Sequence, residues 1–341
     1  MIFNESIGDD TISDLEPSIR PGSFSEFIGQ KDIVSNLQVF IKAAQIRNEP
    51  LDHILFSGPP GLGKTTLARI IAALQKGEFR QVSAPNLKRP GDVVKILSGL
   101  GKNDTLFIDE IHRLSTPVEE VLYSAMEDNQ VDITLSDGLG AMPIQLDIPP
   151  FTLVGATTRP GNLTAPLRDR FGIHLRLDYY NEDEIVEILK NAALKWGISY
   201  ENEAIVEIAR RSRRTPRVSL KLLRRIWDYA IAHNNIQDGI INLSIANGGF
   251  QQMQIDNLGL TALDNKFLQI LAENFQGGPV GLKPLSAALS EDVVTLEEFV
   301  EPFMIRLDLV HRTSRGRVIT QKGYGHINFP APIHGQRMLY E

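Results

Sequence analysis

Short apolar runs, each closed by polar residues, mark the first half of the chain. Residues 53–56, 105–108 and 151–156 are mostly apolar, and runs of this length are typical of strands buried in a parallel sheet. Residues 67–74 are apolar at helical spacing. The pattern therefore predicts the α/β class for this part of the chain, a parallel sheet flanked by helices.

The pattern changes to helices alone after residue 181. Three amphipathic segments predict a small helical lid; they are residues 184–195, 203–211 and 218–232. Pro216 falls in the first turn of the last of these, where its missing N–H costs little. For the neighbouring Arg210, Arg211, Arg213 and Arg214 the sequence leaves two interpretations open, a DNA-binding patch and a solvated, charged helix face, of which the second is the commoner.

The last third predicts a winged helix. Three helices are expected at residues 265–274, 282–289 and 294–305, the last opened by a capping box of Thr295 and Glu298. Two short strands are expected at residues 307–311 and 318–321. We thus divide the chain into a large domain (1–180), a lid (181–251) and a winged helix (254–341).

An alternating pattern interrupts the large domain before its third strand. The apolar positions are Val131, Ile133, Leu135, Met142, Ile144, Leu146 and Ile148, arranged around Asp137-Gly138. Alternation on both sides of an Asp-Gly pair predicts a β-hairpin at about residues 130–148. A hairpin that only caps its own domain is the plainer alternative.

The sequence GPPGLGKT, residues 58–65, connects the first predicted strand to the first helix and has the spacing G-x-x-x-x-G-K-[ST]. In such a loop the backbone N–H groups turn onto phosphate oxygens, the lysine reaches the β- and γ-phosphates, and the hydroxyl ligates Mg²⁺. We expect ATP and Mg²⁺ to be bound by Gly61, Gly63, Lys64, Thr65 and Thr66.

Two carboxylates end the second predicted strand. Asp109 can hold Mg²⁺ through water, and Glu110 can orient and deprotonate the attacking water, which predicts hydrolysis in addition to binding. Thr157 and Thr158 follow the third strand, and a hydroxyl there can sense the γ-phosphate; turn formation is the alternative.

Arginines follow this machinery at two places. Arg168 and Arg170 come shortly after the third strand, where an arginine can reach a neighbouring subunit's nucleotide; a surface ion pair with Asp169 is the plainer interpretation. Arg217 opens the last lid helix and can lean over the phosphates. Both positions suggest that cations complete the site.

A basic excess surrounds the predicted hairpin of the winged helix. Five Lys and Arg residues stand against the single acid Asp308 between residues 306 and 322. Arg312 and Arg317 flank the turn as cross-strand neighbours, so they would project from one side as a fork suited to DNA backbone phosphates. A wing used for protein contact is the alternative.

Composition narrows the setting. The 341 residues include no cysteine, which excludes disulfides and thiolate-bound zinc, and no run approaches a membrane span. We expect a cytoplasmic protein with an acidic tail at residues 1–18. The net charge of −7 argues mildly against nucleic acid, and the local basic excess answers that objection.

Together these motifs resemble the AAA+ ATPases, and the segments between them closely resemble one family, the bacterial Holliday junction branch-migration motors. The resemblance runs from about Ile19 to the C-terminal region. Its most specific segments are FIDEIHR (107–113), SAMED (124–128), PPFTLVGATTR (149–159), RDRFG (168–172), GGPVGL (277–282) and RTSRGR (312–317).

This resemblance implies roles for residues that spacing alone does not assign. Ile19, Arg20 and Tyr180 would flank the adenine, Thr158 would be sensor 1, Arg217 sensor 2, and Arg170 the finger acting in trans. The turn formed by Glu127, Asp128 and Asn129 would approach a neighbour's nucleotide.

The resemblance also implies partners and a process. The chain would form a homohexamer that pulls double-stranded DNA at Holliday junctions, in recombination, repair and the SOS response to DNA damage. Its hairpin would dock on RuvA through Leu139 and Met142, and RuvC would join the assembly. A clamp-loader ATPase or a nucleotide-gated transcription regulator is the rival, but the former lacks this hairpin and winged helix.

Three positions depart from the family pattern. Asn129 replaces an aromatic residue, Arg214 replaces a glycine, and the hairpin tip, residues 136–142, lacks the usual arginine. None of them carries the predicted chemistry.

Overall fold

The structure is a computed structural model that describes residues 19–134, 143–234 and 240–331. The described chain forms two compact units. The first extends to Gly197 and includes Arg214–Leu220; the second comprises Ile198–Arg213 and the described residues from Lys221 onward. The boundaries of the three domains expected from the sequence differ from those of these two units, and the three-domain division stays a prediction.

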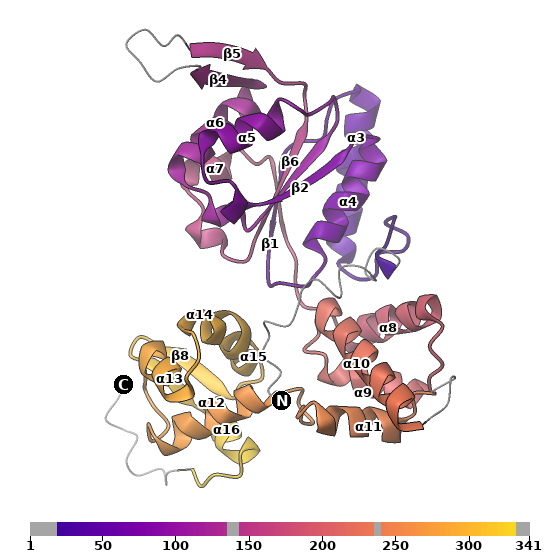
Figure 1. The fold of residues 1–341 in the computed structure, drawn as a ribbon, viewed down its shortest axis with the longest axis vertical. Helices are drawn as coiled ribbons and strands as arrows, with labels where there is room; N and C mark the ends of the chain where they lie inside the picture. Colours follow the sequence, from indigo (N-terminus) through magenta and orange to yellow (C-terminus); the bar gives the residue numbers. More distant parts are fainter. Residues whose placement is uncertain (1–18, 135–142, 235–239, 332–341) are drawn as a thin grey trace. The chain divides into compact units, whose positions relative to one another are not determined.

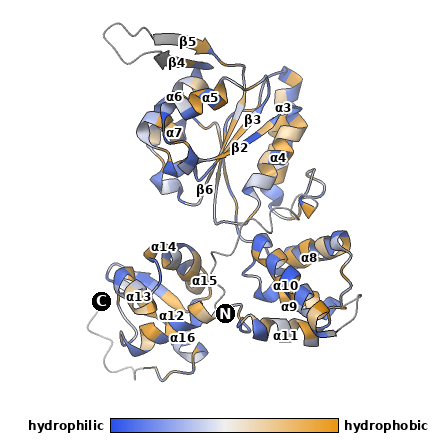
Figure 2. Cartoon of the chain, viewed as in Figure 1, coloured by the Kyte–Doolittle hydropathy of each residue, from blue (hydrophilic) through white to orange (hydrophobic). Residues whose placement is uncertain are grey.

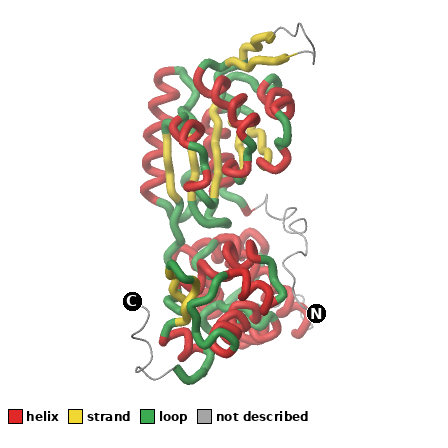
Figure 3. The backbone as a smooth tube through the Cα atoms, turned by 90° about the vertical axis from the view of Figure 1, so that its left-hand side faces the viewer, coloured by secondary structure: helices red, strands yellow, loops and turns green. Residues whose placement is uncertain are grey.

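A five-stranded, wholly parallel sheet forms the centre of the first unit, which confirms the α/β prediction (Figures 1 and 3). The strand order is β2-β3-β6-β1-β7. Its strands are β1 (Ile54–Ser57), β2 (Phe79–Ser83), β3 (Thr105–Asp109), β6 (Thr152–Thr157) and β7 (Ile173–Arg176). Because β1 lies between β6 and β7, the loop after it opens beside the end of β6.

Helices cover both faces of this sheet (Figure 1). The helices are α3 (Lys31–Arg47), α4 (Lys64–Gln75), α5 (Pro90–Leu97), α6 (Thr116–Glu127) and α7 (Ala165–Asp169). Leu106 and Ile108 point into a core shared with α5, α6 and α7, whereas α4 packs against β2, β3 and β6. Helices α3 and α4 carry both hydrophobic and hydrophilic residues (Figure 2), as expected of helices with one buried face.

The predicted inserted hairpin is present as β4 (Gln130–Thr134) and β5 (Pro143–Asp147). Val131 pairs with Leu146 and Ile133 with Ile144, so the alternating apolar positions lie directly opposite one another. The hairpin stands apart from the central sheet in the first unit (Figures 1 and 3). Its predicted tip, with Leu139 and Met142, lies outside the described residues, as does the predicted acidic tail.

Four helices follow the sheet: α8 (Glu182–Trp196), α9 (Asn202–Arg211), α10 (Pro216–Asn234) and α11 (Leu243–Gln252). Both ends of each of the first three helices lie within two residues of the predicted ends. Helix α11 was not predicted, because two adjacent glycines, Gly248 and Gly249, weaken its helical signal. Gly248 lies against the Tyr229 ring, so a small residue is required there by packing.

The winged helix is present in the second unit. Its elements are α12 (Ala262–Glu273), α13 (Leu282–Leu289), α14 (Val293–Thr295), a π-helical turn (Leu296–Val300), α15 (Glu301–Arg306), β8 (Val310–Thr313), β9 (Gly316–Ile319) and α16 (Gln321–His326). The predicted capping box is wrong: Asp292 is the N-cap and accepts from the Val294 N–H, while Thr295 is already helical.

The two strands of the wing lie nearer the turn than predicted. Asp308 adopts φ +60°, which ends the helix, so β8 begins only at Val310. Thr320 caps α16 and ends β9. The loop is therefore only Ser314 and Arg315 between paired Thr313 and Gly316.

Within the described residues, no helix is long and apolar enough to cross a membrane.

Candidate functional site

The glycine-rich loop joins β1 to α4, as its spacing predicts. Gly61 (φ +78°) and Gly63 (φ +105°) adopt left-handed conformations that are costly for other residues. The Gly58 N–H bonds the Thr157 carbonyl at 3.1 Å, which ties the loop to the end of β6. This backbone course leaves the first turn of α4, with its unpaired N–H groups, facing the loop, and that is an arrangement suited to phosphate.

Lys64 is buried within the loop. Its ammonium donates to the carbonyls of Gly58 at 2.8 Å and Pro59 at 2.9 Å. Burial lowers the pKa of Lys64 to about 8, although Asp109 and Glu110 act in the opposite direction. A triphosphate would supply the negative charge that this buried cation lacks, so the site favours an anionic ligand.

Arg217 lies against the same loop, and its role as sensor 2 stays a prediction. Its backbone N–H donates to the Gly61 carbonyl at 3.3 Å. A Cβ on Gly61 would lie 2.8 Å from the Arg217 Cβ and 2.9 Å from Thr215, so only glycine allows this approach. Arg217 also lowers the pKa of Lys64, after the larger effect of burial, which shows that the two cations share one region.

The catalytic carboxylate candidates meet the sensor strand at the ends of β3 and β6. The Thr158 hydroxyl donates to Glu110 Oε2 at 3.3 Å. Asp109 Oδ1 accepts from the Glu110 N–H at 3.0 Å, and Glu110 itself has φ +51°. Of the two threonines, Thr158 is thus the one in contact with the predicted general base.

His112 is a member of this cluster that sequence reasoning missed. Its Nδ1 lies 2.9 Å from Thr157 Oγ1 and 3.2 Å from Glu110 Oε2. Thr157 is fully buried inside β6, and its hydroxyl also accepts from the Arg159 N–H. A histidine two residues after Glu110 could have been noticed as a polar residue close to the end of the strand. The spacing does not indicate where its ring points.

The donors available for Mg²⁺ are hard oxygen atoms. The Thr65 hydroxyl is in the first turn of α4, and the Asp109 carboxylate ends β3, close enough to Lys64 to influence its pKa. Mg²⁺ is usually held by one or two such protein ligands together with water and substrate phosphates. The residues therefore fit this ion.

Arg170 follows α7 and is half-buried, with several contacts inside its own unit. Its guanidinium donates to the Pro166 carbonyl at 2.8 Å and to Glu127 Oε2 at 3.0 Å. The predicted finger and a residue of the predicted Glu127-Asp128-Asn129 turn are therefore on one surface. Asn129 has φ +52°, a conformation that asparagine tolerates better than an aromatic residue, which rationalises the departure at that position.

Of the residues predicted to flank the adenine, Tyr180 contacts the loop. The Tyr180 hydroxyl donates to the Leu62 carbonyl at 3.0 Å, and burial raises the Tyr180 pKa. Ile19 and Arg20 begin the described chain; Arg20 adds, after burial, to the lowering of the Arg69 pKa. The Tyr180 N–H bonds the carbonyl of Arg214, whose φ of +55° explains why a glycine would suit that position.

The two arginines of the wing are partners in backbone register, but their guanidinium groups differ in exposure to solvent. Arg312 and Arg317 are direct cross-strand partners, as predicted. Arg317, however, is 10% exposed and donates twice to Glu301 Oε2, at 3.0 and 2.7 Å. Arg312 is 59% exposed and lies 4.0 Å from Glu297 and Glu301. Both guanidinium groups approach Glu301, so they lie on one side of the wing; Arg312 faces solvent, Arg317 is held by the buried acid, and their use as a DNA-binding fork stays a prediction.

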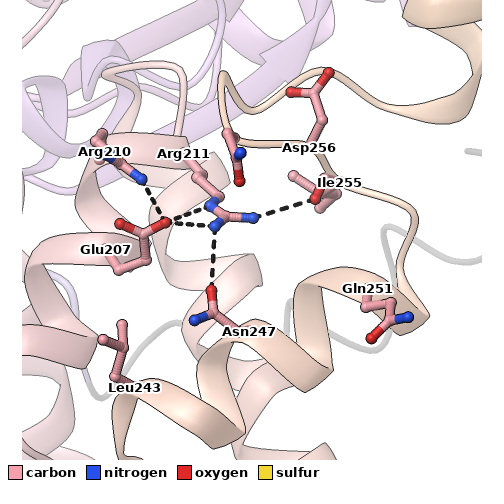
Figure 4. A pocket seen from close by; sticks show the side chains of 9 residues that line it. Glu207, Arg210, Arg211, Leu243, Asn247, Gln251, Ile255 and Asp256 are labelled. Carbon is pink, nitrogen blue, oxygen red and sulfur yellow. Dashed lines mark hydrogen bonds and ion pairs between the residues drawn. The ribbon is translucent and has the colours of Figure 1, made fainter.

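The lid arginines, which the sequence left undecided, divide into exposed and enclosed ones. Arg211 is buried and bonds Glu207, Asn247 and the Ile255 carbonyl at one wall of an open pocket (Figure 4). Arg213 bonds Asp264 and the Gly259 carbonyl and stacks on Phe303 at 4.6 Å. Arg210 and Arg214, by contrast, are exposed. Arg211 and Arg213 therefore hold the second unit together.

Comparison with known families covers almost the whole described chain. Residues 19–177 match the Holliday junction DNA helicase RuvB P-loop domain, residues 180–256 the RuvB AAA lid domain, and residues 257–328 the RuvB C-terminal winged helix domain.

Relatives agree with these matches. The Holliday junction branch migration complex subunits RuvB of Staphylococcus saprophyticus and Staphylococcus aureus are 49% and 50% identical, over 94% and 92% of this chain and 95% and 93% of their own. The solved Thermotoga maritima RuvB Holliday junction branch migration motor is 44% identical, with a TM-score of 0.83 over 92% of this chain and 100% of that one.

Proposed function

The chain belongs to the RuvB family of ATP-driven Holliday junction branch-migration motors, and from that premise we propose which of its own residues perform each part of the work. The observation that carries the proposal is the convergence of Lys64, Glu110 and Thr158 at one end of the parallel sheet. A nucleotide-binding loop, a base and a sensor in contact are the parts that ATP hydrolysis requires.

Nucleotide binding is assigned to the loop and to the residues beside it. Backbone N–H groups from Gly61 to Thr66 hold the phosphates, with Lys64 as their cation. Thr65, and Asp109 through water, would hold Mg²⁺, which when bound would supply positive charge to the phosphates. Ile19, Arg20 and Tyr180 flank the adenine, which fits the position of Tyr180 against the loop at Leu62.

Hydrolysis is assigned to Glu110, which takes a proton from the attacking water. Thr158 bonds this carboxylate, so a change at the γ-phosphate that engages the Thr158 hydroxyl alters the hydrogen bonding of the base. Arg217 reports on the same phosphates through its position on Gly61. We infer that nucleotide state reaches the rest of the chain through these two contacts, of Thr158 with Glu110 and of Arg217 with Gly61.

Arg170 completes a neighbouring subunit's site in a homohexameric ring. A cation at the transition state of phosphoryl transfer is worth roughly 10³–10⁵ in rate when it is supplied as an arginine finger. Glu127, Asp128 and Asn129 stand on the same surface and approach that neighbour's nucleotide. The contact between Glu127 and Arg170 supports this common surface.

Double-stranded DNA at the Holliday junction is the load. Arg312 is exposed on the wing and suits a backbone phosphate, which carries no sequence information. The hairpin of β4 and β5 is the proposed dock for RuvA, with Leu139 and Met142 as apolar anchors, and RuvC joins the assembled complex. The setting is the cytoplasm, in recombination, repair and the SOS response.

Strand displacement from a synthetic four-way junction tests this function. With ATP and RuvA, the protein should dissociate the junction faster than Glu110→Gln, which keeps the loop and the lysine but lacks the base. A linear duplex of equal length is the substrate control. Equal rates for the parent protein and Glu110→Gln would contradict the motor assignment.

A further inference from the structure

One stripe of helix α6 follows helix α7 from end to end. Glu119, Tyr123 and Glu127 are spaced four residues apart, so they lie on the same face of α6. Thr164 is the N-cap of α7 and Arg170 is its C-cap. Glu119 contacts Thr164, Glu127 contacts Arg170, and Tyr123 contacts both ends.

The inner end of this stripe is a closed hydrogen-bond triangle. Glu119 is 3% exposed, and its Oε2 accepts from the Tyr123 hydroxyl at 2.8 Å and from Thr164 Oγ1 at 2.7 Å. The two hydroxyls lie 3.2 Å apart. Burial, with further contributions from its hydrogen bond to Glu119 and the Glu119 charge, raises the pKa of Tyr123, so its hydroxyl stays a donor. The hydrogen bonds of the two part-buried hydroxyls to the buried Glu119 fix the direction of the tyrosine ring.

The outer end of the stripe is the ring of Tyr123 under the guanidinium of Arg170. The Arg170 Cζ lies 4.4 Å from the ring centroid, which is close contact for a cation over an aromatic face. The two terminal nitrogens of Arg170 donate one hydrogen bond each, Nη1 to the Pro166 carbonyl and Nη2 to Glu127. Arg170 Nε is buried and makes no hydrogen bond within the described chain.

We propose that Tyr123 is the positioning residue for Arg170. Its aromatic face sets the plane of the Arg170 guanidinium before the subunits assemble into a hexamer. An aromatic face holds a planar cation without occupying its N–H donors, so those donors remain able to exchange Glu127 and Pro166 for phosphate oxygens. The inference rests on the proposed role of Arg170 in trans. It adds the groups that aim the finger: Tyr123, anchored by Glu119 and Thr164.

The size of the effect follows from what misplacement costs. Errors of about 1 Å in a positioned catalytic group can cost on the order of 10²-fold in rate. Tyr123→Leu, which removes the ring, should lower kcat for DNA-stimulated ATP hydrolysis roughly 10- to 100-fold and leave the KM for ATP within about twofold. Tyr123→Phe keeps the ring and should stay within about threefold. Glu120→Ala, an exposed change on the same helix, is the control for helix stability.

Mixed assemblies separate positioning of the finger from a general defect. A Tyr123→Leu subunit has an intact site but offers a misplaced finger, whereas Lys64→Ala offers an intact finger and no working site. Mixing them should restore hydrolysis, because Tyr123→Leu sites then meet good fingers. Mixing Tyr123→Leu with Arg170→Ala should restore nothing, since both lack the same part.

The same series distinguishes the possible failures. Arg170→Ala mixed with Lys64→Ala tests the trans finger itself, and absence of recovery there overturns the proposed role of Arg170. Recovery in that mixture but none in Tyr123→Leu with Lys64→Ala overturns the role of Tyr123 alone. A parental kcat for Tyr123→Leu also overturns it, whatever the mixtures give.

Discussion

Charged side chains around the phosphate-binding loop keep long contacts or contacts with backbone carbonyls, whereas Arg211, Arg213 and Arg317 of the second unit are held by enclosed acids. Glu110 is bonded at 3.2 and 3.3 Å, and Lys64 donates to loop carbonyls. In the second unit, Glu301 is 2% exposed and holds Arg317 through two hydrogen bonds to one oxygen. Groups that change partners in each turnover need weak ground-state contacts, while groups that hold a fold need saturated ones.

The difference also separates arginines that look alike in sequence. Arg170 and Arg312 keep part of their guanidinium accessible, at 23% and 59% exposure of the side chain. The acids that hold Arg211, Arg213 and Arg317 are at most 13% exposed, whereas Glu127, the acid paired with Arg170, is 55% exposed. A basic cluster therefore indicates neither binding nor structure until each guanidinium has been located.

Breaking the buried pair should have the largest effect on stability. Glu301→Ala leaves the Arg317 guanidinium buried without its acid, and loss of one partner of such a pair costs about 3–5 kcal/mol. Urea unfolding of the full chain should show this as a lower free energy of unfolding, with Glu273→Ala, an exposed change on α12, close to the parent. A loss below 1 kcal/mol would contradict a structural role for the pair.

Removing the exposed wing arginine should give the opposite result. Arg312→Ala should weaken binding to linear duplex of any sequence by about 1.5–3 kcal/mol, the range for a hydrogen bond to a charged group. The slope of log K against log salt should fall by about 0.9, the value for one phosphate contact. Fluorescence anisotropy across a salt series measures both. Stability should not change, and an unchanged slope would remove Arg312 from the DNA surface.

The smallest effect concerns the charge of Lys64. Its pKa of about 8 lies below that of an ordinary lysine, and phosphate binding favours the protonated form, so ATP binding takes up a proton as pH rises above 8. Affinity should be flat below about pH 7 and fall above 8, by at most tenfold per pH unit, or 1.4 kcal/mol. Calorimetry in buffers of different ionisation enthalpy measures the uptake.

Lys64→Arg is the matched control for that titration, because a guanidinium stays charged across this range. Its affinity for ATP should not fall between pH 7 and 9, even if it is weaker throughout. A slope equal to that of the parent protein would assign the titration to another group.

Backbone-driven features were the ones that the sequence could predict. The loop at residues 58–65 works through N–H groups and glycine conformations, so its spacing fixes its geometry, and β1, β3 and β6 appear where short apolar runs predicted them. The direct pairing of Arg312 with Arg317 was predicted from the length of the turn between them. The capping box at Thr295 failed because Asp292 competes for the same helix end three residues earlier.

Side-chain partnerships across elements were out of reach. Nothing local indicates that Glu301 neutralises Arg317, that the His112 ring reaches Thr157, or that Thr164 bonds Glu119. These contacts join residues up to 45 positions apart, and they depend on which face of a helix meets which strand.

The sequence by itself thus determined the parallel sheet, the phosphate loop, the two carboxylates and the helical and winged segments, because each depends on local backbone preference or on periodicity. Tertiary structure decided which charges are available. Arg213 and Arg317 are paired with buried acids, whereas Arg170 is paired with an exposed one and Arg312 faces solvent, and the burial of an acid is decided only when the elements pack.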